Sequence, residues 1–165
     1  MTRVAADDKP APQVSVVIVV YNSGPTLERC LASLNSQTFR DFEVILSDNA
    51  SPDGSAQAAA AQDASLRLIE NGENLGFAGG VNRGAAAARG RWLALLNPDA
   101  YAEPDWLEKL VAATGAYPDT RAFASRQLMA DDATKLDGLG DVMAAAGFPF
   151  RGGYGGRDPG PLAPG

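Results

Sequence analysis

The sequence predicts an α/β fold in which a mostly parallel sheet is flanked by helices. Short aliphatic or β-branched runs begin near Val14, Phe42, Leu66 and Trp92. Each run is apolar on both faces, which is typical of strands that lie inside a parallel sheet. A stretch with helical character follows each run, so strands and helices alternate along the chain. This alternation is the pattern that defines the class.

Three of the predicted helices have clear start signals. Proline stands in the first helical turn at Pro25, Pro52 and Pro104, where it fits because the N–H that it lacks would have no partner there. The first and fourth helices each carry an aliphatic face, formed by Leu27, Leu31 and Leu34 and by Leu107, Leu110 and Val111. These faces are predicted to pack on the sheet.

The remaining segments define the predicted organisation of the chain. Residues 76–89, the third predicted helix, are rich in glycine and alanine, which permits close approach to a strand or a ligand. A further strand is predicted within residues 121–129. Residues 1–12 are polar and are predicted to form a disordered leader, whereas residues 13–130 carry the sheet. Residues 131–165 are rich in glycine and cannot build a core alone.

Composition excludes several classes of function. The net charge of -6 disfavours a nucleic-acid partner, because binding to a phosphate backbone needs a clustered excess of Lys and Arg. The chain has no histidine and a single cysteine, Cys30, which shares helical spacing with Leu27, Leu31 and Leu34 and is predicted to lie in the core. Most zinc sites, Cys/His catalysis and Ser/His/Asp catalysis are therefore excluded. Any metal is expected among oxygen ligands.

No segment of the sequence predicts a membrane span. The longest aliphatic run, Val16 to Val20, is far shorter than the roughly 20 residues that a spanning helix needs. The N-terminus also lacks a signal-peptide pattern. The expected location is the cytoplasm, or the inner face of the membrane as a peripheral protein.

Polar residues follow the apolar runs where the strands are predicted to end. Ligands of open α/β sheets bind at the carboxyl ends of strands, so these residues are the candidates for a binding site. They form four segments: Tyr21-Asn22-Ser23, Ser47-Asp48-Asn49-Ala50-Ser51, residues 71–82 (NGENLGFAGGVN) and Asn97-Pro98-Asp99-Ala100. Taken singly, each segment has a structural explanation as a turn, a helix cap or a site of close helix packing. The glycine-rich segment is neither GxGxxG nor a P-loop.

Taken together at one edge of a sheet, the four segments resemble family 2 glycosyltransferases of the GT-A type. The matching phrases are VSVVIVVYNSGPTLERCLASL, FEVILSDNASPDGS, NLGFAGGVNRG and WLALLNPDA, within Gln13 to Tyr117. NLGFAGGVNRG is similar to the rhamnosyltransferase-like branch, whose enzymes act on cell-surface polysaccharides. The resemblance implies a Rossmann-like GT-A fold, truncated here. Residues 13–130 would be its nucleotide-sugar-binding half, and residues 131–165 the incomplete start of the acceptor region.

The resemblance also implies roles for single residues. Tyr21 would stack on a uracil or thymine ring. Asp48 would accept the N3–H of that base, which rejects bases without this donor because a buried carboxylate would be left unpaired. The other predicted contacts to the nucleotide-sugar are Asn22, Asn74, Gly76, Phe77 and Asn82.

Asp99 matches the last position of the DXD motif of the family. At that position a carboxylate holds Mg²⁺ or Mn²⁺ against the diphosphate, and oxygen ligands suit either ion. Asn97 replaces the first Asp of the motif and Pro98 fills its middle. This departure leaves the metal ligand in place but puts in doubt a side-chain contact from position 98 to the ribose.

The implied activity is transfer of a sugar, with inversion, from a UDP- or dTDP-linked donor to a hydroxyl group of a glycan or lipid-linked acceptor. Nothing after Met129 resembles the general base of the family, so the base is expected beyond Gly165 and the chain is predicted to be an inactive fragment. Two alternatives stay open. One is a non-catalytic nucleotide-binding or regulatory module of the same fold. The other is a dinucleotide-binding Rossmann domain, which is disfavoured because no GxGxxG follows Val20.

Overall fold

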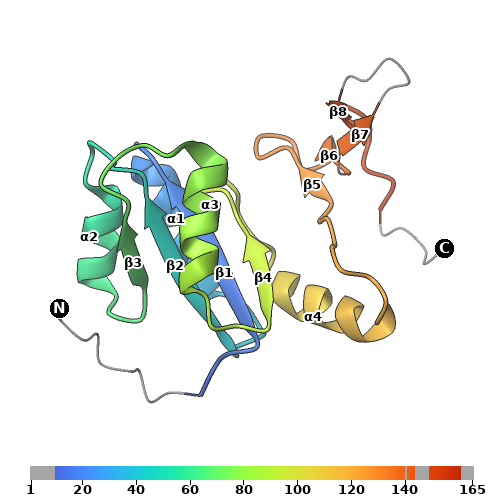
Figure 1. The fold of residues 1–165 in the computed structure, drawn as a ribbon. Helices are drawn as coiled ribbons and strands as arrows, with labels where there is room; N and C mark the ends of the chain where they lie inside the picture. Colours follow the sequence, from blue (N-terminus) through green and yellow to red (C-terminus); the bar gives the residue numbers. More distant parts are fainter. Residues whose placement is uncertain (1–9, 140, 144–148, 161–165) are drawn as a thin grey trace. The chain divides into compact units, whose positions relative to one another are not determined.

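The computed structural model describes residues 10–139, 141–143 and 149–160 (Figure 1). The first nine residues of the predicted leader lie outside the described residues. The chain forms two compact units, Met1–Val111 and Ala112–Gly165. The functional boundary predicted at residue 130 stays a prediction.

The first unit is built on a four-stranded sheet in the order β3-β2-β1-β4, with all strands parallel (Figure 1). The strands are β1 (Val14–Val20), β2 (Phe42–Asp48), β3 (Arg67–Glu70) and β4 (Trp92–Leu95). β1 is buried along its whole length, which is why its sequence is apolar on both faces. Val20 pairs with Asp48, and Val17 pairs with Leu95. The predicted α/β class with a parallel sheet is confirmed.

Helices cover both faces of this sheet. They are α1 (Gly24–Asn35), α2 (Ser55–Gln62), α3 (Gly76–Ala87) and α4 (Trp106–Ala116). Leu27, Cys30 and Leu34 of α1 share one buried core with Leu107 of α4 and with alternate residues of β1 that begin at Val14. The predicted packing of these aliphatic faces is confirmed, and Cys30 is a core residue.

Helix α3 lies on the opposite face and approaches β1 closely because two of its glycines face the strand. A Cβ atom at Gly80 would lie 2.6 Å from Cγ1 of Val19, and one at Gly84 would lie 2.4 Å from Cγ1 of Val17. Close-packed interiors do not tolerate such distances, so only glycine permits this approach. The glycine-rich sequence therefore weakens the helix but lets it lie directly on the sheet.

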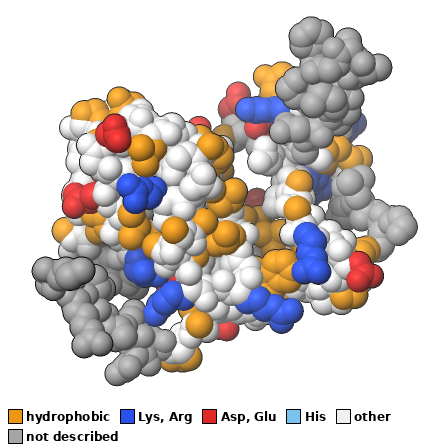
Figure 2. All heavy atoms as spheres, in the orientation of Figure 1, with side chains coloured by type: hydrophobic (Ala, Val, Ile, Leu, Met, Phe, Trp, Pro, Cys, Tyr) orange, Lys and Arg blue, Asp and Glu red, His pale blue; other side chains and the backbone are white. Residues whose placement is uncertain are grey.

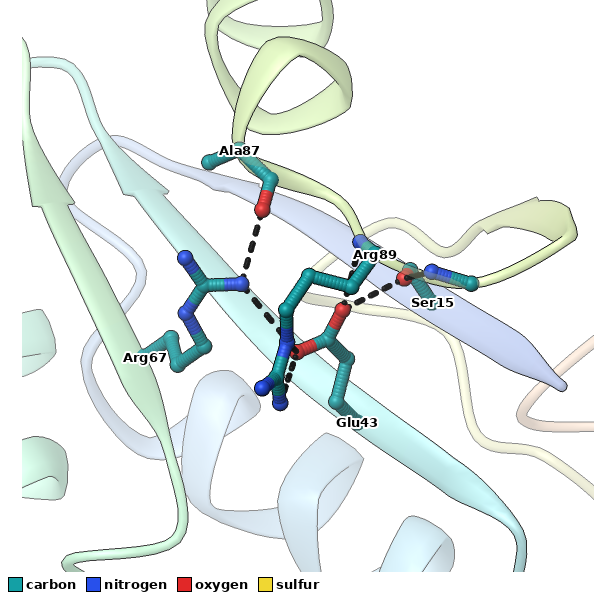
Figure 3. Close-up of polar contacts among 6 residues, drawn as sticks. Ser15, Glu43, Arg67, Ala87 and Arg89 are labelled. Atoms are coloured by element: carbon teal, nitrogen blue, oxygen red, sulfur yellow. Dashed lines mark hydrogen bonds and ion pairs between the residues drawn. The ribbon is translucent and has the colours of Figure 1, made fainter. Parts of the chain in front are cut away.

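An ionic cluster fastens the far end of α3 to the amino-terminal edge of the sheet (Figure 3). Oε1 of Glu43, on β2, accepts hydrogen bonds from Oγ of Ser15 at 2.7 Å and from the backbone N–H of Arg89 at 2.8 Å. Its Oε2 accepts from the guanidinium groups of Arg67 and Arg89, both at 3.1 Å. Arg67 also donates to the carbonyl of Ala87 at 2.7 Å. Burial opposes the charge of Glu43, but these hydrogen bonds from Ser15, Arg89 and Arg67 outweigh it and hold the pKa of the carboxyl below its ordinary value.

The α3 face of the sheet is open at β4. Leu93 and Leu95 are 49% and 48% exposed there. Hydrophobic side chains are visible beside α3 in the space-filling view (Figure 2). Within the described part of the first unit, α3 covers β1 and β2 but leaves this edge strand uncovered.

The second unit contains two antiparallel pairs of strands. β5 (Gln127–Leu128) pairs with β6 (Leu136–Gly138), and β7 (Asp141–Met143) pairs with β8 (Pro149–Arg151). A strand is predicted within residues 121–129. In the structure Gln127 and Leu128 form it, because these are the residues that pair with β6. A hollow of about 810 Å³ in this unit is bordered by Arg151, Gly153, Tyr154 and Gly156. None of the helices in the described part of the chain is long and apolar enough to cross a membrane.

Candidate functional site

Three predicted site residues end or follow adjacent strands at the carboxyl edge of the parallel sheet. Tyr21 follows the central strand β1, Asp48 ends the neighbouring strand β2, and Asp99 follows β4 on the other side. Pairing continues beyond β4, since the N–H of Leu96 donates to the carbonyl of Val17 at 3.1 Å. Neighbouring strands lie about 4.8 Å apart, so the strands that lead to Asp48 and Asp99 lie on the two sides of the strand that leads to Tyr21. None of the three borders the hollow of the second unit.

Asp48 is almost completely buried, and both of its carboxylate oxygens are hydrogen-bonded. The residue is 2% exposed. Oδ1 accepts the backbone N–H of Ser51 at 3.1 Å, and Oδ2 accepts Nε2 of Gln57 at 3.0 Å. A carboxylate has about four lone-pair sites, so each oxygen can accept one further donor. The side chain is thus held in one orientation with acceptor capacity left over.

A network of side-chain amides joins the ends of β2 and β3 to the start of α3. Nδ2 of Asn71 donates to Oδ1 of Asn49 at 2.9 Å and to Oγ of Ser47 at 3.0 Å. Nδ2 of Asn49 donates to the carbonyl of Gly76 at 3.0 Å and to Oδ1 of Asn74 at 3.3 Å. Oδ1 of Asn74 also accepts the N–H of Gly76 at 2.9 Å. The amide oxygen of Asn74, predicted to line the ligand, is therefore engaged in ordering the loop before α3.

The other predicted contacts differ in how well they are placed. Tyr21 is 51% exposed and Phe77, in the first turn of α3, is 56% exposed. Gly76 begins α3 with a φ of 70°, a left-handed conformation that glycine adopts without strain. Asn82 is exposed in the second turn of α3, about 200° around the helix from the buried Gly80. It therefore lies on the side of α3 that faces away from the sheet.

The loops after β1 and β2 are fastened to each other. The N–H of Asn22 donates to Oγ of Ser51 at 2.6 Å, and the N–H of Gly24 donates to Oδ2 of Asp53 at 2.9 Å. Oδ1 of Asp53 accepts from the hydroxyl of Ser51 and from Ser55 at the start of α2. These donors, the Ser51 hydroxyl above all, hold the pKa of Asp53 well below its usual range. A carboxylate thus occupies the N-terminus of α1.

This placement weighs against a dinucleotide-binding Rossmann domain. Such domains bind the pyrophosphate at the N-terminus of the helix that follows the first strand, through free backbone N–H groups. Here the N–H of Gly24 is bonded to Asp53, Pro25 has no N–H, and the N–H of Thr26 donates to the carbonyl of Ser23 at 3.1 Å. A diphosphate at this helix would meet a negative charge.

Asp99 stands at the corner of a tight turn after β4. The N–H of Ala100 donates to the carbonyl of Asn97 at 3.0 Å, which closes a β-turn with Pro98 at its second position. Proline suits that position because its ring fixes φ near -65°. The replacement of the middle residue of the DXD motif by Pro98 thus has a structural explanation. Asp99 is exposed, and its carboxylate has no hydrogen bond or ion pair within the described residues.

Helix α1 holds the segment that carries this turn. The Sγ–H of Cys30 points to the carbonyl of Asn97 at 3.5 Å, and Oγ of Ser33 accepts the N–H of Ala102 at 3.0 Å. Burial raises the pKa of Cys30 to about 12, and the nearby charge of Asp99 adds to the effect. Gln37, which is fully buried just after the end of α1, also contacts the chain that follows the Asp99 turn.

Gln37 was missed by the sequence reasoning, because it is a polar residue that follows the C-terminal end of α1 and no local pattern marks it as buried. Its Oε1 accepts the N–H of Leu107 in α4 at 3.0 Å, and its Nε2 donates to the carbonyl of Glu103 at 2.8 Å. Arg29 stacks over the ring of Tyr101 at 4.1 Å. The Asp99 turn is therefore positioned by contacts along one side of α1.

The donor set fits a divalent cation shared with a ligand better than a cation enclosed by protein. The described residues contain no group of three or more acidic, Cys or His side chains that could hold a metal. Mg²⁺ commonly takes one or two carboxylates, with phosphate oxygens and water in the remaining positions. One exposed carboxylate at Asp99, free of protein partners in the described part of the chain, meets that description.

Comparison with known proteins decides the family. Residues 15–136 match the family model described as "Glycosyl transferase family 2". The chain belongs to glycosyl transferase family 2. This confirms the resemblance found in the four sequence motifs.

Two relatives illustrate where this family 2 chain stands. It is 38% identical over 127 residues to N-acetylglucosaminyl-diphospho-decaprenol L-rhamnosyltransferase of Mycobacterium tuberculosis, covering 70% of this chain and 41% of that protein. It is 36% identical over 130 residues to succinoglycan biosynthesis protein ExoO of Rhizobium meliloti, covering 77% of this chain and 35% of that protein. The chain thus spans about two fifths or less of the lengths of these relatives.

Solved structures share the fold of this family 2 chain. S. aureus TarS 1-349 in complex with UDP-GlcNAc matches with a TM-score of 0.60 and 21% identity over 70% of this chain and 38% of that one. The mannosyltransferase PcManGT of Pyrobaculum calidifontis, in complex with GDP-Man and Mn²⁺, matches with a TM-score of 0.51 and 30% identity over 59% of this chain and 30% of that one. The predicted GT-A-like fold is confirmed.

Proposed function

We propose that this chain is the nucleotide-sugar-binding part of an inverting glycosyltransferase. The observation that carries the proposal is that Tyr21, Asp48 and Asp99 end or follow three adjacent strands at the carboxyl edge of one parallel sheet, in a member of family 2. The donor would be linked to UDP or dTDP, and the acceptor would be a hydroxyl group of a glycan or a lipid-linked sugar. The names of the relatives, which include a rhamnosyltransferase and a succinoglycan biosynthesis protein, support a role in cell-surface polysaccharide or glycoconjugate synthesis.

The base would lie between the exposed ring of Tyr21 and the buried carboxylate of Asp48. Tyr21 would stack on the pyrimidine, and stacking of a base on an aromatic side chain contributes roughly 1 to 3 kcal/mol. Asp48 would accept the N3–H of uracil or thymine with an oxygen whose orientation Ser51 and Gln57 already fix. Phe77 and Asn22 would border the ribose or the sugar-phosphate.

The diphosphate would lie toward Asp99 rather than toward α1. Asp99 would bind Mg²⁺ or Mn²⁺, and the bound ion would supply positive charge that stabilises the departing nucleoside diphosphate. The carboxylate of Asp53 at the N-terminus of α1 would repel the diphosphate from that side. The two carboxylates would therefore act in opposite senses, one through a cation and one by direct repulsion.

We do not assign the general base to Asp132, Asp137 or Asp158 of the second unit. Asp132 bonds to Lys135 at 2.8 Å, Asp137 to Arg151 at 2.7 Å and Asp158 to Arg126 at 3.0 Å. The hydrogen bond from Lys135, with further bonds from Thr134, lowers the pKa of Asp132 to about 2. A carboxylate of so low a pKa is a weak base, because an efficient general base has a pKa near the working pH.

Titration calorimetry of the 165-residue chain with UDP, with and without Mn²⁺, tests the proposal. We expect Mn²⁺ to raise the affinity for UDP about tenfold or more, and Asp99→Asn to abolish that increase. Asp119→Asn, which removes an exposed carboxylate of the second unit, is the matched control. Equal UDP affinity in wild type and Asp99→Asn under both conditions would remove the metal assignment. No binding of UDP or dTDP, or tight binding of NADH, would overturn the function.

A further inference from the structure

Gln57 bridges two carboxylates at the edge of the sheet where the base is proposed to bind. It lies in the first turn of α2, between the ends of β2 and β3. Its Nε2 donates to Oδ2 of Asp48 at 3.0 Å and to Oε1 of Glu70 at 3.1 Å. A single neutral donor group is therefore shared by two acidic side chains.

The other end of the Gln57 amide is unsatisfied. Its Oε1 is buried and has no hydrogen-bond partner among the described residues. A buried acceptor without a donor lowers stability, and such an atom in a native structure calls for an explanation. An apolar side chain of similar length would avoid the penalty. The presence of glutamine is thus better explained by what its Nε2 does for Asp48 than by the stability of α2.

Two donors together fix the plane of the Asp48 carboxylate. The N–H of Ser51 holds Oδ1, and Nε2 of Gln57 holds Oδ2. Without Gln57, Oδ2 would lose its partner and the negative charge of Glu70 would face Asp48 without an intervening donor. Like charges at short range repel, so the carboxylate would turn from its present orientation.

We propose that Gln57 is a positioning residue that makes Asp48 selective for a base that carries an N3–H donor. The inference rests on the proposed function, because it requires that Asp48 contact the base. Uracil and thymine present N3–H to the carboxylate, whereas cytosine presents an N3 lone pair. A carboxylate that is held with an oxygen toward N3 accepts the N3–H of uracil or thymine, but it faces a second lone pair when the base is cytosine. With cytosine the buried carboxylate stays unpaired, and this lowers the affinity.

The test compares UDP with CDP, since the two nucleotides differ only in the base. Their dissociation constants are measured by titration calorimetry in the presence of Mn²⁺ for wild type, for Gln57→Met and for the control Gln62→Met at the exposed end of the same helix. We expect wild type to prefer UDP by about tenfold or more, and Gln57→Met to lose most of that preference by weakening UDP alone. Gln62→Met should match wild type. The melting temperature of Gln57→Met is measured as well, and we expect it to fall modestly, because Oδ2 of the buried Asp48 loses its donor when the orphaned acceptor is removed.

The outcomes separate this inference from the proposed function. An unchanged ratio of UDP to CDP affinity in Gln57→Met, or an equal loss for both nucleotides, would overturn the role of Gln57 and leave the proposed function standing. Equal binding of UDP and CDP by wild type would remove base reading by Asp48 and the inference with it, whereas the Mn²⁺ effect at Asp99 would still report on the nucleotide site. Gln57→Glu is a second variant of matched shape. It replaces the shared donor with a third carboxylate and should also abolish the preference.

Discussion

The carboxylate of Asp53 accepts the backbone N–H of Gly24 at 2.9 Å, so a residue of the loop after β2 occupies the N-terminus of helix α1. In many α/β proteins that position receives a phosphate group. Here it holds the loops after β1 and β2 together, whereas the proposed cation ligand, Asp99, lies in the turn after β4. Under the proposed function, this distribution of charge would direct the diphosphate toward Asp99.

Asp53→Asn is expected to destabilise the first unit in a pH-dependent way. The folded-state pKa of Asp53 is held below its ordinary value of 3.8, first by the Ser51 hydroxyl, so its contribution is present above that value and is lost as the pH falls below it. We expect a loss of about 1 kcal/mol in the free energy of unfolding at pH 7, shrinking below about pH 4. Urea unfolding at pH 7, 5 and 3 measures this. A difference that stays constant with pH would contradict it, and Asp119→Asn is the control.

Glu43→Gln is expected to loosen the attachment of α3. The substitution keeps the shape of the side chain but removes the charge that Arg67 and Arg89 share, at a residue that is 8% exposed. Hydrogen bonds to charged groups contribute about 1.5 to 3 kcal/mol, and we expect a loss of about 2 kcal/mol in the free energy of unfolding. Chemical denaturation at pH 7 tests this. Glu28→Gln, on the exposed side of α1, should leave the free energy of unfolding unchanged. An equal effect of both substitutions would contradict the stabilising role of the Glu43 charge.

Gly84→Ala is expected to destabilise the protein although alanine is the better helix former. The new Cβ would lie 2.4 Å from Cγ1 of Val17, and overpacking of this kind costs typically 1 to 3 kcal/mol, against about 1 kcal/mol gained in helix propensity. At Gly115 of α4 a Cβ would meet nothing within 4 Å. Gly115→Ala should therefore be neutral or stabilising. Thermal unfolding of both variants decides whether close packing or propensity dominates in α3.

Ser33→Ala is expected to weaken the metal-dependent part of nucleotide binding. The hydroxyl accepts the N–H of Ala102, three residues after Asp99, so its loss should let the Asp99 turn move. We expect the gain in UDP affinity on addition of Mn²⁺ to fall about two- to fivefold, with metal-free affinity unchanged. Ser36→Ala is the control, because it removes a hydroxyl at the C-cap of α1 that bonds, within the described part of the chain, to the carbonyl of Ser33. An equal change in both variants would contradict the role of Ser33.

Much of the fold follows from the sequence because its signals are local. β1 is apolar on both faces, and Leu27 and Leu34 keep helical spacing, so strand, helix and packing face could each be predicted from a short window. Once the strands are parallel, their carboxyl ends share an edge, which is why Tyr21 and Asp99 could be placed together. By contrast, the strand expected after residue 121 depended on a distant partner strand, and no local pattern reveals the length of that partner.

The parts of the site that the sequence did not reveal depend on pairs of polar side chains far apart in the chain. Asn49 and Asn71 form one hydrogen bond across 22 positions, and Gln37 reaches Leu107 across 70. An amide side chain can donate and accept, so its type alone does not identify its partner. Gln57 shows the same difficulty, since only the register of β2 and β3 places Asp48 and Glu70 on either side of it.

Ala50, in the loop after β2, has a φ of 55°, and Asn22, in the loop after β1, has a φ of 51°. A left-handed backbone costs a residue other than glycine roughly 1 to 2 kcal/mol, and asparagine bears it more easily than alanine. We therefore expect Ala50→Gly to raise the melting temperature of the protein. The same change would make the loop after Asp48 more flexible, which would weaken the proposed binding of the base. The methyl group of Ala50 thus lowers thermal stability but keeps the loop ordered.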